Sequence, residues 1–295
     1  MRSSRRRPPS EVVEAIKLGL DQGVNHFDNA DIYGNGRAER MLSNALIRLG
    51  VKSDSVVIAT KVGHFLGTAA HAYEPAHIRH QCEQSLVNLK RGYIDIYYFH
   101  HGDFGSDDQY LPGAIETVNT LQKEGKIRAV GLSAYSADHF LKLTPQIKPA
   151  VLQSWAHIID PQFVTPGSKV SRLMDQMNLH FVAFSPLAQG LLLGKYSSTS
   201  APTFEPGDHR QQSSQFKTES LRDLEPKIEQ LKARFGTTAE DLASTSLNYL
   251  LAQPRVASVI PGFRNATQAK CNLGAIGKKL TPEDIVFIDN VFGRA

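Results

Sequence analysis

Short β-prone runs alternate with helical segments along almost the whole chain of 295 residues. Seven apolar runs have the length of buried strands, and each is followed by a segment with helical periodicity. The seven runs cover residues 24–30, 55–62, 94–100, 127–134, 150–155, 181–186 and 256–260. An alternation of this kind predicts a parallel β-sheet that is covered by α-helices.

The number of strands leaves more than one architecture open. A (β/α)8 TIM barrel has eight strands, one more than the sequence shows. The chain begins with a helical segment at residues 11–20, for which Ser10 is the expected N-cap, and residues 1–9 have no strand character. The first strand is therefore either missing or replaced by an irregular closure. A doubly wound open sheet is the alternative, although no Gly-x-Gly-x-x-Gly motif follows an early strand.

Composition and charge exclude several classes of protein. With 41% hydrophobic and 21% charged residues, the chain has the composition of a soluble globular protein. No apolar run approaches the roughly 20 residues of a membrane span. The net charge of +4 gives no indication of nucleic-acid binding. The two cysteines, Cys82 and Cys271, favour a reducing compartment, and we expect the protein to be cytoplasmic.

Part of the positive charge lies at the N-terminus, in Arg2, Arg5, Arg6 and Arg7. We expect residues 1–9 to form a disordered basic tail. A targeting segment is the weaker alternative, because these residues contain no apolar stretch. Residues 10–295 contain no linker, and we expect them to form one domain.

Three polar residues stand at the C-terminal ends of successive predicted strands, where α/β barrels build their sites: Asp28, Lys61 and His100. Tyr33 lies in the loop after the first strand. Lys61 would favour the phenolate and lower the pKa of Tyr33 from about 10, while Asp28 would keep the lysine charged. His100 is suited to hydrogen-bond a carbonyl oxygen. The set has no nucleophile or metal cage, so it suits carbonyl polarisation with a hydride supplied by a cofactor.

Longer motifs around these residues resemble the aldo-keto reductase superfamily. They are Phe-Asp-x-Ala-x-x-Tyr-Gly at 27–34, Ile-Ala-Thr-Lys-Val-Gly at 58–63, Tyr-Ile-Asp-Ile-Tyr-x-x-His at 93–100, Gly-Leu-Ser at 131–133, Phe-Ser-Pro-Leu-x-x-Gly-Leu-Leu-x-Gly-Lys-Tyr at 184–196 and Ile-Pro-Gly at 260–262. The resemblance covers the chain from about residue 10 onward. It implies a barrel and a catalytic tetrad of Asp28, Tyr33, Lys61 and His100. Tyr33 would be the general acid in the reduction of an aldehyde or ketone, with NADP(H) as the usual cofactor and NAD(H) as the alternative.

The resemblance also assigns residues to the cofactor. Ser133 and Gln153 match residues that hold the nicotinamide carboxamide, and Phe184 takes the place of an aromatic that stacks on the ring. The pyrophosphate would be lined by Ser185, Leu187, Gln189 and Gly190. The adenosine and its 2′-phosphate would be surrounded by Gly262, Arg264, Gln268 and Asn272. Arg210, in the polar segment 197–219, would either clamp the cofactor or remain exposed to solvent.

The sequence departs from the family pattern at several points. Asn29 replaces a common threonine, and Ala134 replaces an asparagine, which removes one expected hydrogen bond to the carboxamide. Residues 101–103 lack a proline that is frequent after the catalytic histidine. The sequence shows no match to the N-terminal hairpin and first barrel strand of the family, and we therefore expect two neighbouring strands with unpaired edges.

Other functions remain open at this point. A barrel of this type could hold NADPH and regulate a partner, as the resemblance to potassium-channel β subunits permits. A metal-dependent hydrolase would use His100, His101 and Asp103, but further spaced ligands are lacking. For a reductase, the substrate is a small carbonyl compound, with a sugar-type carbonyl as one option. Its identity would depend on the loop after His100, on Trp155 and His157, and on residues 197–219. The oligomeric state does not follow from the sequence.

Overall fold

The computed structural model describes residues 9–204, 208–263 and 265–294. Within them, seven parallel strands form one sheet in which neighbours in sequence are neighbours in space. The strands are β1 (His26–Asp28), β2 (Val57–Val62), β3 (Ile94–Phe99), β4 (Ile127–Ser133), β5 (Val151–Trp155), β6 (His180–Phe184) and β7 (Val256–Ile260). This order confirms the predicted parallel sheet. The doubly wound alternative is wrong, because the strand order of that fold reverses within the sheet.

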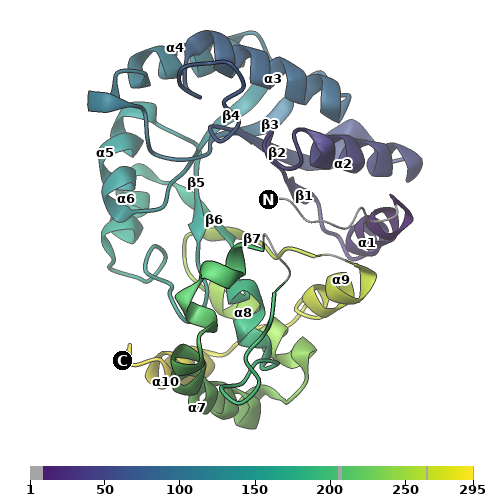
Figure 1. Cartoon of the computed structure of the whole chain (residues 1–295), viewed down its shortest axis with the longest axis vertical. Coiled ribbons are helices and arrows are strands. Elements are labelled where there is room, and N and C mark those ends of the chain that lie inside the picture. Colours follow the sequence, from purple (N-terminus) through teal and green to yellow (C-terminus); the bar gives the residue numbers. More distant parts are fainter. Residues whose placement is uncertain (1–8, 205–207, 264, 295) are drawn as a thin grey trace.

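The sheet curves into a nearly closed barrel, and the described helices lie around it (Figure 1). They are α1 (Pro9–Asp21), α2 (Arg37–Arg48), α3 (Pro75–Leu89), α4 (Leu111–Lys123), α5 (Ala137–Ile147), α6 (Lys169–Met177), α7 (Thr218–Phe235), α8 (Ala239–Leu251), α9 (Ala266–Leu273) and α10 (Pro282–Val291). None of these helices is long and apolar enough to cross a membrane.

Local sequence explains most helix ends. At α8 and α10, Thr238 with Asp241 and Thr281 with Asp284 form capping boxes, each of which satisfies two backbone N–H groups. Two predicted boundaries are wrong. Helix α1 begins at Pro9, so Ser10 lies in its first turn and is not the N-cap. Helix α9 ends at Leu273 and not near residue 279, because glycines at 274 and 277 favour a turn. The remainder of the predicted tail, residues 1–8, lies outside the described residues.

Side chains on alternate strand positions fill the barrel interior or pack under the helices. The outer set includes Ile58, Phe99 and Leu132, all fully buried. The inner set includes Tyr98, whose ring lies against Gly131 on the neighbouring strand. A Cβ atom at position 131 would lie 2.3 Å from this ring, so only glycine fits there.

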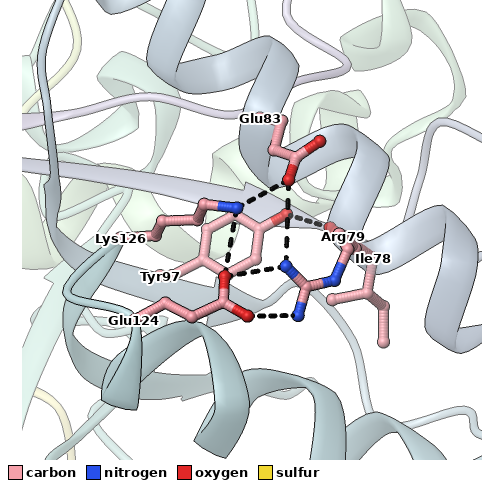
Figure 2. Close-up of polar contacts among 6 residues, drawn as sticks. All are labelled: Ile78, Arg79, Glu83, Tyr97, Glu124 and Lys126. Atoms are coloured by element: carbon pink, nitrogen blue, oxygen red, sulfur yellow. Dashed lines mark hydrogen bonds and ion pairs between the residues drawn. The ribbon is translucent and has the colours of Figure 1, made fainter.

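The wall of the barrel at α3 and α4 is tied together by a surface network of ion pairs, which we call the α3–α4 network: Arg79, Glu83, Glu124 and Lys126 (Figure 2). Arg79 donates two hydrogen bonds of 2.8 Å to the carboxylate of Glu124. Lys126 lies 2.7 Å from Glu83 and 3.0 Å from Glu124. Beneath it, the Tyr97 hydroxyl donates a hydrogen bond to a carbonyl of α3. The network therefore links α3 to the end of α4 and the start of β4.

The barrel is not closed between β1 and β7. In the described part of the chain, these two strands do not pair with each other, which confirms the predicted unpaired edges; we call this place the seam. Strand β1 has three residues and is shorter than the predicted run 24–30, because the Val24 amide donates back to the Gly19 carbonyl of α1 and the chain enters a turn at residues 31–36. A side-chain hydrogen bond of 3.1 Å between His26 Nδ1 and Ser258 Oγ spans the seam. Outside it, α1 packs against α9.

Candidate active site

The structure brings the four predicted catalytic residues together at the C-terminal ends of β1 to β3. Lys61 donates hydrogen bonds to Asp28 Oδ1 and to the carbonyl oxygen of Asn29, the latter at 2.7 Å. Its Nζ atom lies 5.6 Å from the centre of the Tyr33 ring. The rings of Tyr33 and His100 face edge to plane, with centroids 6.0 Å apart.

The ion pair between Lys61 and Asp28 is buried, with side-chain exposures of 1% and 9%. Burial lowers the pKa of Lys61, and the Asp28 carboxylate opposes that shift. The second oxygen of Asp28 accepts a hydrogen bond of 2.9 Å from Gln153 Nε2. Asp28 is therefore held from two strands, and its position fixes that of the ammonium group.

The pKa of Tyr33 is not lowered in this structure, contrary to the prediction, because other contributions outweigh that of Lys61. Burial raises the pKa of Tyr33, and the negative charge of Asp28 raises it further. The reason is geometric, because the Lys61 ammonium donates to Asp28 and to the Asn29 carbonyl and lies beneath the ring of Tyr33. The phenol is consequently in its protonated form at neutral pH.

His100 is a buried, neutral imidazole. Burial lowers its pKa to about 2, and the nearby Lys61 contributes to the shift. Its Nδ1 atom has no hydrogen-bond partner among the described residues. A neutral imidazole carries one N–H donor and one acceptor, so His100 can donate a hydrogen bond to a carbonyl oxygen.

A cavity of about 1960 Å³ opens beside these residues, and Asp28, Tyr33 and His100 line it. The predicted cofactor residues within the described part of the chain all line this cavity: Ser133, Gln153, Phe184, Ser185, Leu187, Gln189, Gly190, Arg210, Gly262, Gln268 and Asn272. Arg264 lies outside the described residues. Arg210 forms an ion pair of 2.6 Å with Asp208 at the cavity edge.

Two observations on the cavity wall fit a bound dinucleotide. The hydroxyl oxygen of Ser133 is buried and has no hydrogen-bond partner within the described chain, so a ligand amide would satisfy it. Three non-glycine residues in one short loop, Ser185, Ala188 and Gln189, have φ angles of 53°, 46° and 56°. Such left-handed backbone costs about 1–3 kcal/mol per residue and clusters where a chain grips a ligand. This loop is the predicted pyrophosphate path.

Sequence reasoning missed several residues of the cavity. Lys195, Lys278 and Tyr135 line it, and His64 lies at its mouth beside His100. The signal for Lys195 was present in the Gly-Lys-Tyr motif at 194–196. In contrast, Trp155 is not among the lining residues, because its indole N–H donates to Asp160 at 2.8 Å.

His101 has a structural role. Its Nδ1 accepts a hydrogen bond of 3.2 Å from the Asp103 amide, and its Nε2 bonds the carbonyl of Gly63 at 2.7 Å. Both ring nitrogens are therefore occupied. Among the described residues, no group of three or more His, Cys, Asp or Glu side chains is arranged to hold a metal ion. His100, His101 and Asp103 therefore do not form the ligand set that the hydrolase alternative needs.

The fold and the site together define a class: a parallel α/β barrel with an acid–base set at its strand ends and a large cavity beside it. The chain belongs to the aldo/keto reductase family, whose sequence profile matches residues 2–292. It is accordingly an oxidoreductase of that family.

Relatives agree with this assignment. L-galactose dehydrogenase of Arabidopsis thaliana is 26% identical over 275 residues, which cover 90% of this chain and 78% of the relative. Aflatoxin B1 aldehyde reductase member 2 of Rattus norvegicus is 27% identical over 300 residues, with coverages of 93% and 78%. The glycerol dehydrogenase structure from Gluconobacter oxydans superposes with a TM-score of 0.82 at 24% identity, and the match covers 98% of this chain and 88% of that one. The last likeness concerns the fold.

Proposed function

We propose that the protein reduces an aldehyde or ketone to an alcohol with NADPH, and that Tyr33 donates the proton. The observation that carries this proposal is the buried Lys61–Asp28 ion pair beneath the ring of Tyr33, next to His100 and open to the cavity. If the ion pair served only to stabilise the fold, the phenol of Tyr33 and the neutral imidazole of His100 would not need to lie beside it at the cavity.

The residues divide the chemistry among them. A bound nicotinamide cofactor would supply the hydride. His100 donates a hydrogen bond to the carbonyl oxygen and thereby polarises the C=O bond. Tyr33 then gives its proton to the same oxygen as negative charge develops there; an alkoxide is a stronger base than a phenolate, so a raised pKa of Tyr33 does not prevent this transfer. Lys61 stabilises the phenolate that remains, and Asp28 holds Lys61 in place.

We propose NADP(H) as the preferred cofactor. Ser133 and Gln153 would hold the nicotinamide amide, and Phe184 would stack on the ring. Among the described residues, four cationic side chains line the cavity and suit the additional phosphate: Lys195, Arg210, Lys278 and Lys279. The substrate would be a small carbonyl compound.

We also propose a cytoplasmic location, with which the free thiols of Cys82 and Cys271 agree.

The test is the substitution Tyr33→Phe, which removes the donated proton and keeps the ring. We expect kcat for aldehyde reduction to fall by about 10²–10⁴-fold, the usual contribution of a general acid. The dissociation constant for NADPH, measured by fluorescence titration, should change little. An undiminished kcat would contradict the assignment. Tight NADPH binding by the wild-type protein without turnover of any aldehyde would favour a regulatory role instead.

A further inference from the structure

One imidazole at the mouth of the cavity has no place in the proposed mechanism. His64 follows β2 by two residues, its side chain is exposed, and it lines the cavity. Its ring lies edge-on against that of His100, with centroids 4.4 Å apart. On the other side it contacts the ring of His101 at 4.9 Å. His64 is thus held by packing in a fixed position next to the residue that polarises the carbonyl.

Unlike its neighbour His101, His64 has free ring nitrogens. In the described part of the chain, its contacts are ring contacts, and no hydrogen bond to its side chain is found. Burial lowers the pKa of His64, and the His101 ring adds to the effect. A neutral imidazole both donates and accepts a hydrogen bond, which matches a hydroxyl group better than a carboxylate.

We propose that His64 is a specificity-determining residue that binds a hydroxyl group of the substrate near the reacting carbonyl. This inference rests on the proposed function. The rings of His64 and His100 have centroids 4.4 Å apart, so we expect a hydroxyl that contacts His64 to lie one or two carbons from the carbonyl carbon that His100 polarises. The preferred substrates are therefore neutral hydroxyaldehydes, and unsubstituted aldehydes of the same length are poorer substrates.

The experiment compares glyceraldehyde with propanal, which has the same carbon chain without hydroxyl groups. The variants are His64→Leu, which removes the hydrogen bond, and His64→Asn, which retains a donor and an acceptor. His80→Leu, an exposed histidine on α3 away from the cavity, is the control. We expect His64→Leu to lower kcat/KM for glyceraldehyde by about 10-fold, mainly through KM, since one buried hydrogen bond has this value.

For propanal, His64→Leu should change kcat/KM by less than about 2-fold. His64→Asn should recover part of the loss with glyceraldehyde, and His80→Leu should change neither substrate. Equal losses for both aldehydes, or no loss for either, would overturn the role of His64 while leaving the proposed reduction intact. If the wild-type protein reduces other aldehydes but not glyceraldehyde, this inference alone fails. If it binds NADPH but reduces no aldehyde or ketone, the proposed function itself fails, and this inference fails with it.

Discussion

The two sides of the barrel are built differently. On the side opposite the seam, which we call the paired side, β3 and β4 each pair with strands on both edges, and β3 is almost wholly buried. The α3–α4 network links the helices outside these strands (Figure 2). At the seam, β1 has three residues that are all partly exposed, and it pairs with β2 alone. The side-chain hydrogen bond from His26 to Ser258 crosses to β7.

The four proposed catalytic residues lie where these two regions meet. Lys61 lies at the end of β2 and His100 directly after β3, on the paired side, while Asp28 ends β1 at the seam. The hydrogen bonds from Lys61 and Gln153 to Asp28 hold the end of β1 against the rest of the sheet. The ion pair that orients Lys61, the proposed catalytic lysine, therefore also anchors the strand with the fewest partners.

The largest effect is expected where the two regions meet. Lys61→Met should lower kcat by about 10²–10⁴-fold, because the positive charge beneath Tyr33 is lost. It should also cost about 3–5 kcal/mol of unfolding free energy, because a buried carboxylate loses its cation. Steady-state kinetics and urea unfolding measure the two effects. A variant with normal kcat would contradict the role of Lys61, and normal stability would contradict its role as an anchor.

The next largest effect compares the loss of stability when a strand side chain is truncated on the paired side and at the seam. Ile94→Ala on β3 removes a fully buried side chain and should cost about 2–5 kcal/mol of unfolding free energy. Ile260→Ala on β7 removes a partly exposed side chain at the cavity and should cost less than about 1.5 kcal/mol. Urea denaturation of both variants checks the ranking. Equal costs would show that the seam is as well packed as the paired side.

A smaller effect belongs to the hydrogen bond across the seam. A double-mutant cycle of His26→Ala and Ser258→Ala should give a coupling of about 0.5–1.5 kcal/mol in unfolding free energy.

Burial lowers the pKa of His26, so the unfolded chain binds a proton at this residue below pH about 6.5, while the folded protein does not. The wild-type protein should therefore lose stability relative to His26→Ala as the pH falls below this value. A pH-independent difference would contradict this reading.

The smallest effect is expected in the exposed α3–α4 network. Arg79 and Lys126 hold the pKa of Glu124 at about 2, so the network stabilises the fold above the unfolded pKa of about 4.3 and loses this contribution as the pH falls toward 2. Glu124→Gln should lower the melting temperature slightly. The difference should vanish near 1 M salt, where the screening length is about 3 Å. A large, salt-independent loss would mean that the network is not governed by exposed charges.

Most of the fold follows from the sequence, because buried strands are continuous apolar runs whose ends are marked by turn residues. The convergence of the four proposed catalytic residues was also predictable, since strand ends of a parallel barrel converge. Three features were not. Strand β1 is shortened by a bond from the Val24 amide to the end of α1. His26 and Ser258 are 232 positions apart and ordinary in type, and the raised pKa of Tyr33 depends on burial depth.

The most direct test of the central claim is to mix the wild-type protein with NADPH and glyceraldehyde, to follow NADPH absorbance, and to identify the product. The structure predicts one glycerol formed for each NADPH consumed, and loss of this turnover in Tyr33→Phe with NADPH binding retained. NADPH that binds tightly and is not consumed with glyceraldehyde or any other carbonyl compound would contradict the claim that this barrel is a carbonyl reductase.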